Sequence, residues 1–429
     1  MDDIENISYS LETESDLDLL IEHAGHRRAV LIGGSTHGTA EFYKWRANIT
    51  KRLIEEKGFS FVSVEGDWPH CYEVNRYVKG VINRGLEAED ILYVFNRWPT
   101  WIWANYETLD FIRWLAEYNT GISDEQKVGF YGLDFYSLWD SLSMAVKYLE
   151  ETVPEAAQTA RQVYRCFEPQ RRDIDGHKWT IALVSESCEE DIAKFLTSLQ
   201  HLPPAKSADT EERFNAEQNA LAVVDAERYY RVMPTGDPDT WNLREQHMAN
   251  TFFRLREFHG KTFEAKGIIW AHNAHICDAG ATEMADRSET SVGQLVRERL
   301  GKDEAYLIGF GTFQGRVVAA YDWDAPVRDM ELPPAIYGSW ESVLHNLGEK
   351  NRLLLFSRHK ARNELFLEKR SHRTVGVVYD PNSEFPNYIE TYLDEAYDAF
   401  LHIDTTSALH PFPTEPKTGE MPGTFPSAV

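Results

Sequence analysis

The sequence predicts an α/β fold, with a parallel or mostly parallel sheet covered by helices and a large helical insertion. Short apolar runs alternate with amphipathic segments in the first and last thirds of the chain, and convincing strand signals are missing from the middle. Such alternation is typical of a parallel sheet with helices on its faces. No repeat of fixed period occurs, which argues against a solenoid or propeller.

The expected strands are apolar, rich in β-forming residues and too short to be helices. The four best candidates are residues 29–32, 60–64, 128–132 and 267–270. Further strand signals follow at 305–310, 353–356, 374–379 and 399–403. Helices with one apolar face are expected over residues 41–56 and 103–117.

The 429 residues suffice for one large interrupted domain with a substantial core. We expect an α/β catalytic core formed by residues 1–136 and 260–408. Residues 137–259 form a helical insertion that contributes to the cleft. Residues 409–429 are rich in Pro, Gly and Thr, and this composition predicts an extended or disordered tail.

Composition narrows the function classes. The 44 Lys and Arg against 69 Asp and Glu give a formal net charge of −25, which repels nucleic acid. No apolar run approaches the ~18 residues that span a bilayer, so no membrane partner is expected. Four cysteines without a CxxC pair and a start without signal-peptide features indicate the cytoplasm. The 13% aromatic content suits either a mixed core or a pocket for a small molecule with an apolar body. The sequence is also compatible with assembly into a homo-oligomer.

Each of the four best strand candidates runs directly into a polar, turn-prone cluster. In open α/β sheets ligands bind at the carboxyl ends of strands, so these clusters should meet at one site. His37 lies in a loop flanked by glycines, and its imidazole can accept a proton from water near neutral pH. It can equally be an N-cap or packing residue. Arg46, nine residues on, can stabilise an oxyanion or hold a carboxylate, although a solvated helix charge is the plainer interpretation.

Glu65 follows the second strand and can orient a histidine, or simply cap the next segment. His272 and His275 follow the fourth strand at a spacing that places both on one side of a helical turn. They can bind substrate, donate to an oxyanion, or ligate a metal with His37, Cys277 or Glu65. Because HxxH is not the HExxH zinc signature, we favour the site without metal or other cofactor.

Aromatic residues near these clusters are candidates for substrate binding, with core packing as the alternative for each. They are Trp68, Trp101 and Trp103. In the insertion, Arg244 lies in the segment WNLREQHM, where it can anchor an anion or form an ordinary salt bridge on an amphipathic helix.

Seven ordered motifs resemble the erythromycin esterase family over about residues 16–411. They are GGSTHGTAEFYKWR, VEGDWPHCYEVNRYV, FNRWPTWIW, GFYGLDFYSL, WNLREQHMA, WAHNAHICD and VGVVYDP. The resemblance implies an α/β core with a helical insertion. It also implies a hydrolase, since the best-known members cleave the lactone ester of macrolide antibiotics.

The resemblance also implies roles for single residues. The family's general base falls on His37, its helix arginine on Arg46, and its strand-two glutamate on Glu65. Its paired histidines fall on His272 and His275.

Three positions depart from the family pattern. The glutamate that the family usually carries three residues before the base is here Gly34, which should enlarge the pocket locally and place Gly34 beside the substrate. Ala104 and Glu245 replace a common Arg and Asp. The resemblance thus implies hydrolysis of an ester or lactone by water that His37 activates. The alternatives are a different reaction or a non-catalytic small-molecule binder, because of Gly34, and a metal-dependent enzyme using His37, His272 and His275.

Overall fold

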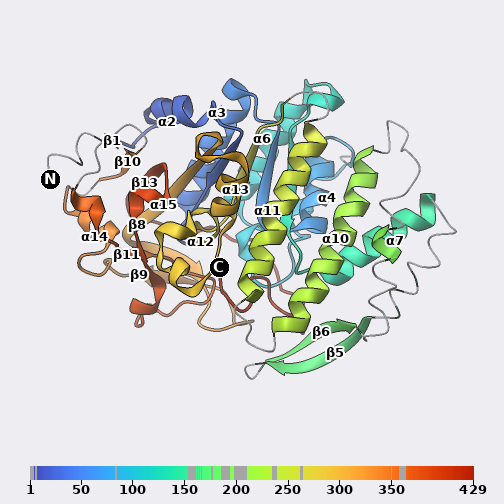
Figure 1. The fold of residues 1–429 in the computed structure, drawn as a ribbon. Helices are drawn as coiled ribbons and strands as arrows, with labels where there is room; N and C mark the ends of the chain where they lie inside the picture. Colours follow the sequence, from blue (N-terminus) through green and yellow to red (C-terminus); the bar gives the residue numbers. More distant parts are fainter. Residues whose placement is uncertain are drawn as a thin grey trace.

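The computed structural model describes residues 4, 7–82, 85–152, 161, 163, 165, 167–174, 177–184, 194–197, 210–233, 239–260, 264–348, 350–356 and 364–429. A central twisted sheet lies between two groups of helices (Figure 1). Successive residues of one buried strand point to opposite faces: Val30 and Ile32 join one hydrophobic cluster, Ala29 and Leu31 the other. The sheet is therefore covered on both faces.

The main sheet has the strand order β1-β10-β13-β8-β2-β7-β3-β4, with β9 also paired to β8. The strands are β1 (Ser8–Ser10), β2 (Ala29–Ile32), β3 (Phe61–Asp67), β4 (Gly129–Asp134), β7 (Gly267–Trp270), β8 (Ala305–Ala319), β9 (Arg328–Leu332), β10 (Arg352–Leu355) and β13 (Ala399–Thr406). The run from β13 to β4 is parallel, whereas β1, β9 and β10 pair antiparallel to their neighbours. This mostly parallel, helix-covered sheet confirms the predicted fold class.

The α-helices are α2 (Asp18–Ala24), α3 (Ala40–Lys57), α4 (Trp68–Val78), α5 (Ala88–Leu92), α6 (Tyr106–Thr120), α7 (Leu138–Thr152), α10 (Thr210–Val232), α11 (Asp239–His259), α12 (Asn273–Ile276), α13 (Val292–Leu300), α14 (Trp340–His345) and α15 (Leu393–Ala396). Helix α3 ends at Gly58, whose φ of 70° is left-handed, and the Gly58 N–H closes the last turn on Ile54. Asn105 caps α6 by accepting from the Thr108 N–H at 2.7 Å.

The predicted strand boundaries differ from the structure in two instructive places. β3 and β4 continue to Asp67 and Asp134, so acidic residues expected in turns lie within strands. The strand predicted at 374–379 is wrong. Only single bridges occur there, from Val375 to Thr36 and from Val378 to Ala320, because each backbone group finds a different distant partner.

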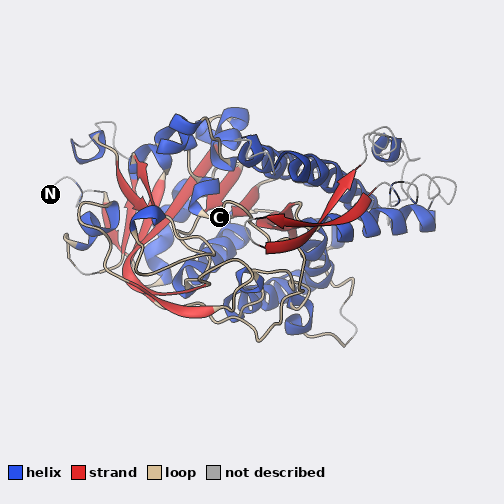
Figure 2. Ribbon diagram, turned by 90° about the horizontal axis from the view of Figure 1, so that it is seen from below, coloured by secondary structure: helices blue, strands red, loops and turns tan. Residues whose placement is uncertain are grey.

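The residues predicted to form an insertion, 137–259, contain α7, α10 and α11, but they also contain a hairpin that the sequence patterns did not predict. β5 (Phe167–Ile174) pairs antiparallel with β6 (His177–Val184). In Figure 1 the hairpin lies below α10, and Figure 2, turned by 90°, shows it crossing that side of the molecule. Trp179 of β6 is fully buried, so this hairpin packs on the protein.

Residues 409–429, all described, carry no helix or strand and yet are packed against the protein. Phe412, Met421 and Phe425 are each at most 4% exposed. The chain reaches Val429 between α11 and α12, in the middle of the view in Figure 1. No helix within the described residues is long and apolar enough to cross a membrane.

Candidate active site

The sheet order brings the predicted site residues together. β2, β7, β3 and β4 are neighbours, and their carboxyl ends lead to His37, to His272 and His275, to Glu65 and to Asp134 respectively. Parallel strands end at the same edge of a sheet, so these side chains converge from segments more than 200 residues apart. Trp241 and Arg244 reach the same place from α11.

His37 is buried and has a free imidazole nitrogen. Its ring centroid lies 5.0 Å from that of His272, and its Nε2 lies 3.8 Å from Oε1 of Glu65, too far for a hydrogen bond. Nε2 has no hydrogen-bond partner among the described residues. Burial lowers the pKa of His37 from its ordinary 6.5 to about 4, against the opposing attraction of Glu65. The imidazole is therefore neutral at pH 7 and able to accept a proton.

His272 is a neutral hydrogen-bond donor. Its Nδ1 accepts from the Ala274 N–H at 3.2 Å, so the neutral ring carries its hydrogen on Nε2. Burial, reinforced by His37, holds the pKa of His272 well below its usual range. Within the described part of the chain, Nε2 has no partner. An oxygen placed beside it would receive a hydrogen bond.

His275, unlike His37 and His272, is positively charged. Its Nδ1 lies 2.6 Å from Oε1 of Glu245 and its Nε2 lies 3.4 Å from Oε1 of Glu65, while Trp241 stacks on the ring. Burial alone would lower the pKa of His275, but the carboxylates of Glu245 and Glu65 outweigh it and raise that pKa to about 10. His275 is thus a cation held between the carboxylates of Glu245 and Glu65. Its ring nitrogens are engaged there, whereas Nε2 of His272 is free within the described chain.

Glu65 is fixed by two hydrogen bonds in addition to its ion pair with His275. Its Oε1 accepts from Nη2 of Arg244 at 2.9 Å, and its Oε2 accepts from the backbone N–H of His272 at 2.8 Å. Burial raises the pKa of Glu65, but the nearby His275 and His37 hold it well below the usual range. The carboxylate is therefore charged, and it fixes the His272 loop more firmly than it fixes His37.

Arg244 is the hub of a buried charge network. Its Nη2 donates to Asp134 Oδ2 at 2.7 Å as well as to Glu65, and its guanidinium lies 5.1 Å from the Tyr136 ring centroid. Nη1 donates to the backbone oxygen of Val429 at 2.5 Å. Arg244 was predicted to anchor an anion from the substrate, and here protein groups engage it. Asp134 was not among the predicted site residues, although its position directly after the predicted strand 128–132 and Leu133 was a usable signal.

Arg46 holds backbone at the site. Its Nε donates to the Gly33 carbonyl at 2.6 Å and its Nη2 to the Ala271 carbonyl at 2.8 Å. A Cβ atom on Gly34 would lie 2.5 Å from Nη2 of Arg46. The prediction that Gly34 enlarges the pocket is therefore wrong, because the guanidinium fills that space. Arg46 is almost completely buried, and no carboxylate in the described ranges pairs with it.

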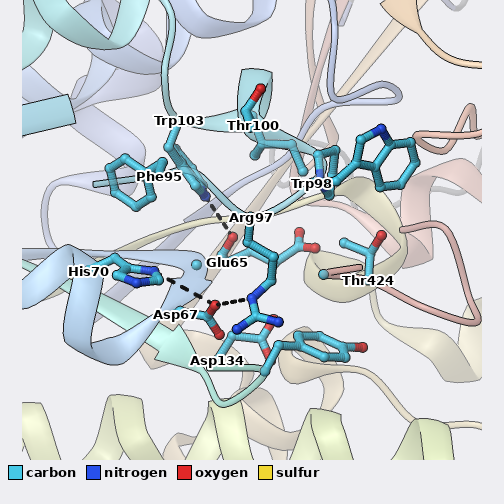
Figure 3. Close-up of a pocket in the computed structure, with 15 residues that line it drawn as sticks. Glu65, Asp67, His70, Phe95, Arg97, Trp98, Thr100, Trp103, Asp134 and Thr424 are labelled. Atoms are coloured by element: carbon cyan, nitrogen blue, oxygen red, sulfur yellow. Dashed lines mark hydrogen bonds and ion pairs between the residues drawn. The ribbon is translucent and has the colours of Figure 1, made fainter. Parts of the chain in front are cut away.

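A small cavity of about 60 Å³ opens beside Glu65 (Figure 3). It is lined by Glu65, Gly66, Asp67, His70, Phe95, Arg97, Trp98, Pro99, Thr100, Ile102, Trp103, Asp134, Tyr136, Gly423 and Thr424. Of the tryptophans predicted to bind substrate, only Trp103 lines it, with Nε1 donating to the Glu65 carbonyl at 2.9 Å. Trp68 and Trp101 are buried in the core: Trp68 stacks on Tyr131, and Trp101 packs edge-on against Trp98.

Within the described residues, no group of three or more His, Cys, Asp or Glu is arranged to hold a metal ion. His37 and His272 face each other, but His275 turns its nitrogens to Glu245 and Glu65. The arrangement suits proton transfer and hydrogen-bond donation in a site shielded from water.

Known proteins share this architecture. An erythromycin esterase family model matches residues 54–406. The Escherichia coli protein erythromycin esterase type II is 21% identical over 419 residues, covering 89% of this chain and 90% of that protein. A solved succinoglycan biosynthesis protein has a TM-score of 0.74 at 22% identity, covering 95% of this chain and 96% of its own. An erythromycin esterase mutant solved in its open conformation has a TM-score of 0.65 at 15% identity, covering 96% and 97%. The chain belongs to the erythromycin esterase family.

Proposed function

We propose that this protein hydrolyses an ester or lactone bond in a small molecule, with His37 as general base. One observation carries the proposal: the buried, neutral imidazole of His37 has a free Nε2, and the adjacent His272 offers a free Nε2–H donor, at the carboxyl edge of the sheet. A base needs an unprotonated nitrogen, and an oxyanion needs a donor that is already oriented. Both are present in the same site.

In the proposed reaction, His37 takes a proton from water as the water oxygen attacks the carbonyl carbon. The carbonyl π electrons move to oxygen, and the Nε2–H of His272 donates to that oxyanion. When the tetrahedral intermediate collapses, the bond to the alkoxy oxygen breaks and His37 returns the proton to the leaving alcohol. Atoms and charge balance without a cofactor.

The other charged residues act by position in this proposal. Glu65 fixes the His272 loop, Arg244 neutralises Glu65 and Asp134, and His275 is a cation locked in place. Arg46 ties the loop after β2 to the loop after β7. We therefore assign the oxyanion to His272 rather than to Arg46 or His275.

The aromatic wall of the cavity, with Phe95, Trp98 and Trp103, suits a substrate with an apolar body. A panel of macrolide lactones, aryl esters and acyl sugars tests the proposal. We expect His37→Gln to abolish turnover of the accepted substrate. The matched variant His402→Gln, which changes another buried histidine on β13, should keep it. Equal turnover in both variants would refute a role for His37.

Gly34 supports a second candidate, a family member with altered chemistry or a non-catalytic binder of small molecules. Losing a carboxylate partner of a catalytic imidazole costs several orders of magnitude in other enzymes. If the native chain binds members of the panel without turnover and Gly34→Glu gains hydrolysis, this second candidate holds.

A further inference from the structure

Residues 419–429, which we call the strap, pass along one side of the cavity. The Gly423 N–H donates to the Trp98 carbonyl at 2.8 Å, and Nη1 of Arg97 donates to the Met421 carbonyl at 2.9 Å. Gly423 and Thr424 line the cavity, with Thr424 beside Trp98 and across from His70 in Figure 3. The strap is therefore one wall of the cavity beside Glu65. His37 does not line this cavity itself, but its Nε2 lies 3.8 Å from Oε1 of Glu65, which does.

The strap also occupies hydrogen-bond donors that point toward the site. Its Phe425 carbonyl accepts from the hydroxyls of Tyr229 at 2.5 Å and Tyr136 at 3.2 Å. Its Val429 backbone oxygen accepts from Nη1 of Arg244 at 2.5 Å. Arg244 also bonds Glu65, so the strap is one contact away from the carboxylate that fixes the His272 loop.

Two buried side chains, Phe425 and Met421, anchor the strap in one hydrophobic cluster. Phe425 is 2% exposed and packs edge-on against Trp179 of the hairpin at 4.7 Å and Trp323 at 5.0 Å. The strap itself has no helix or strand, so few cooperative backbone bonds hold it. Met421 is also 2% exposed, Glu420 pairs with Arg97 at 3.2 Å, and the Val377 N–H donates to the Ala428 carbonyl at 2.8 Å. All these contacts lie outside the strand pairs of the main sheet, so the segment can open without disturbing the sheet.

With the strap in this position, the structure has no room for a substrate at the histidines or in the cavity. His37 is 3% exposed, His272 and His275 are 0% exposed, and the cavity of about 60 Å³ holds only a few waters. Sites for small molecules usually measure roughly 300–1,000 Å³. The other walls come from β3, β4, α4 and the packed 95–103 segment, which belong to the core. The strap differs from the strand and helix walls because it carries no helix or strand, and its two anchoring side chains belong to a separate hydrophobic cluster.

We propose that the strap is an autoinhibitory plug that must leave before substrate reaches His37. Its departure frees the donors of Arg244, Tyr136 and Tyr229, which then bond carbonyl or hydroxyl oxygens of the substrate in place of the strap carbonyls. The inference deepens the proposed hydrolase and rests on it for the catalytic consequence. The opening itself can be measured without catalysis.

Thr100 provides that measurement because it lines the cavity under the strap and is 8% exposed. In a Thr100→Cys background, the rate at which iodoacetamide alkylates position 100 is read by peptide mass spectrometry. We expect Phe425→Ala, and a variant that ends at Thr418, to raise this rate at least about tenfold. Phe412→Ala is the matched control, since Phe412 is an equally buried ring that packs on Tyr93 and Tyr106 away from the cavity.

Cys277, buried beside α12, reports unfolding in the same samples. If Cys277 becomes reactive in the variant that ends at Thr418, that variant has unfolded and its alkylation rate is not used. The result for Phe425→Ala then decides whether the strap opens. A rate at position 100 that Phe425→Ala leaves unchanged overturns the plug. Activity is measured in separate variants that keep the native Thr100 and are not alkylated. There we expect kcat/KM for the accepted ester to rise severalfold in Phe425→Ala and not in Phe412→Ala. A fall in kcat/KM would show that the strap helps to bind substrate and overturn its autoinhibitory role. If Phe425→Ala raises the alkylation rate at position 100 but no variant hydrolyses any ester, the strap still opens as proposed and the hydrolase proposal is refuted.

Discussion

Oε1 of Glu245 lies 2.6 Å from Nδ1 of His275, and neither side chain is accessible to solvent. The second oxygen of Glu245 accepts from the Val292 N–H at 2.9 Å, so the longer Glu at a position where the family commonly carries Asp reaches both groups. Burial raises the pKa of Glu245, and His275 opposes that rise. Because Glu245 compensates it, the positive charge of His275 can remain buried in the site.

The first prediction concerns Glu245→Gln. Because the folded pKa of His275, about 10, exceeds its unfolded value of 6.5, its protonation stabilises the fold fully below pH 6.5, and this contribution is lost as pH rises toward 10. Glu245→Gln should lower that pKa and flatten the loss between pH 7 and 10. Urea unfolding across this range measures the effect. An alkaline profile identical to that of the native chain would contradict the charged pair.

The second prediction concerns His37, whose pKa shift has the opposite sign. The folded pKa of about 4 lies below the unfolded 6.5, so the unfolded chain binds more protons and stability falls as pH drops from 6.5 through 4. His37→Gln should reduce this acid loss. The basic form persists to about pH 5, and the acid limb of kcat/KM should therefore lie near pH 4 and not 6.5. A limb at 6.5 would show that His37 is solvated when it reacts.

The sequence predicts the buried strands best. Residues 29–32 and 267–270 match β2 and β7 because fully apolar runs bounded by turns admit few alternatives. It cannot predict that β3 includes Glu65 and Asp67, since acids rarely end a buried strand. They do so here because partners far along the chain, Arg244 and Arg97, compensate their charge.

The site shows the same limit. The local motifs identify His37 and His272, but not that Arg46 fills the space beside Gly34 or that the strap lines the cavity. Both depend on contacts between loops rather than on residue type. Composition predicts an extended or disordered tail, whereas Phe425 packs on Trp179 of a hairpin that the sequence patterns did not predict.

The third prediction concerns Gly34. Gly34→Ala places only a Cβ against Nη2 of Arg46, and this overpacking should cost about 1–3 kcal/mol of unfolding free energy. Gly34→Glu makes the same contact but adds a carboxylate that can pair with Arg46, so it should be more stable than Gly34→Ala. Thermal unfolding of the two variants compares them directly. A lower Tm for Gly34→Glu than for Gly34→Ala would show that the site has no place for that carboxylate.

The fourth prediction concerns Arg46 as a positioning residue. Arg46→Met keeps the length of the side chain but leaves the Gly33 and Ala271 carbonyls without their donor, which should cost about 2–4 kcal/mol. Arg52→Met is the matched control on α3, because its ion pairs with Asp18 and Glu56 lie near the surface and should be worth less than about 1 kcal/mol.

The loops after β2 and β7 carry His37 and His272, so loosening them should lower kcat for the accepted ester more than it changes KM. Urea unfolding and steady-state kinetics separate the two effects. A rise in KM with kcat intact would instead show that Arg46 binds the substrate itself. Equal losses of stability in Arg46→Met and Arg52→Met would contradict the role of Arg46 in joining the loops.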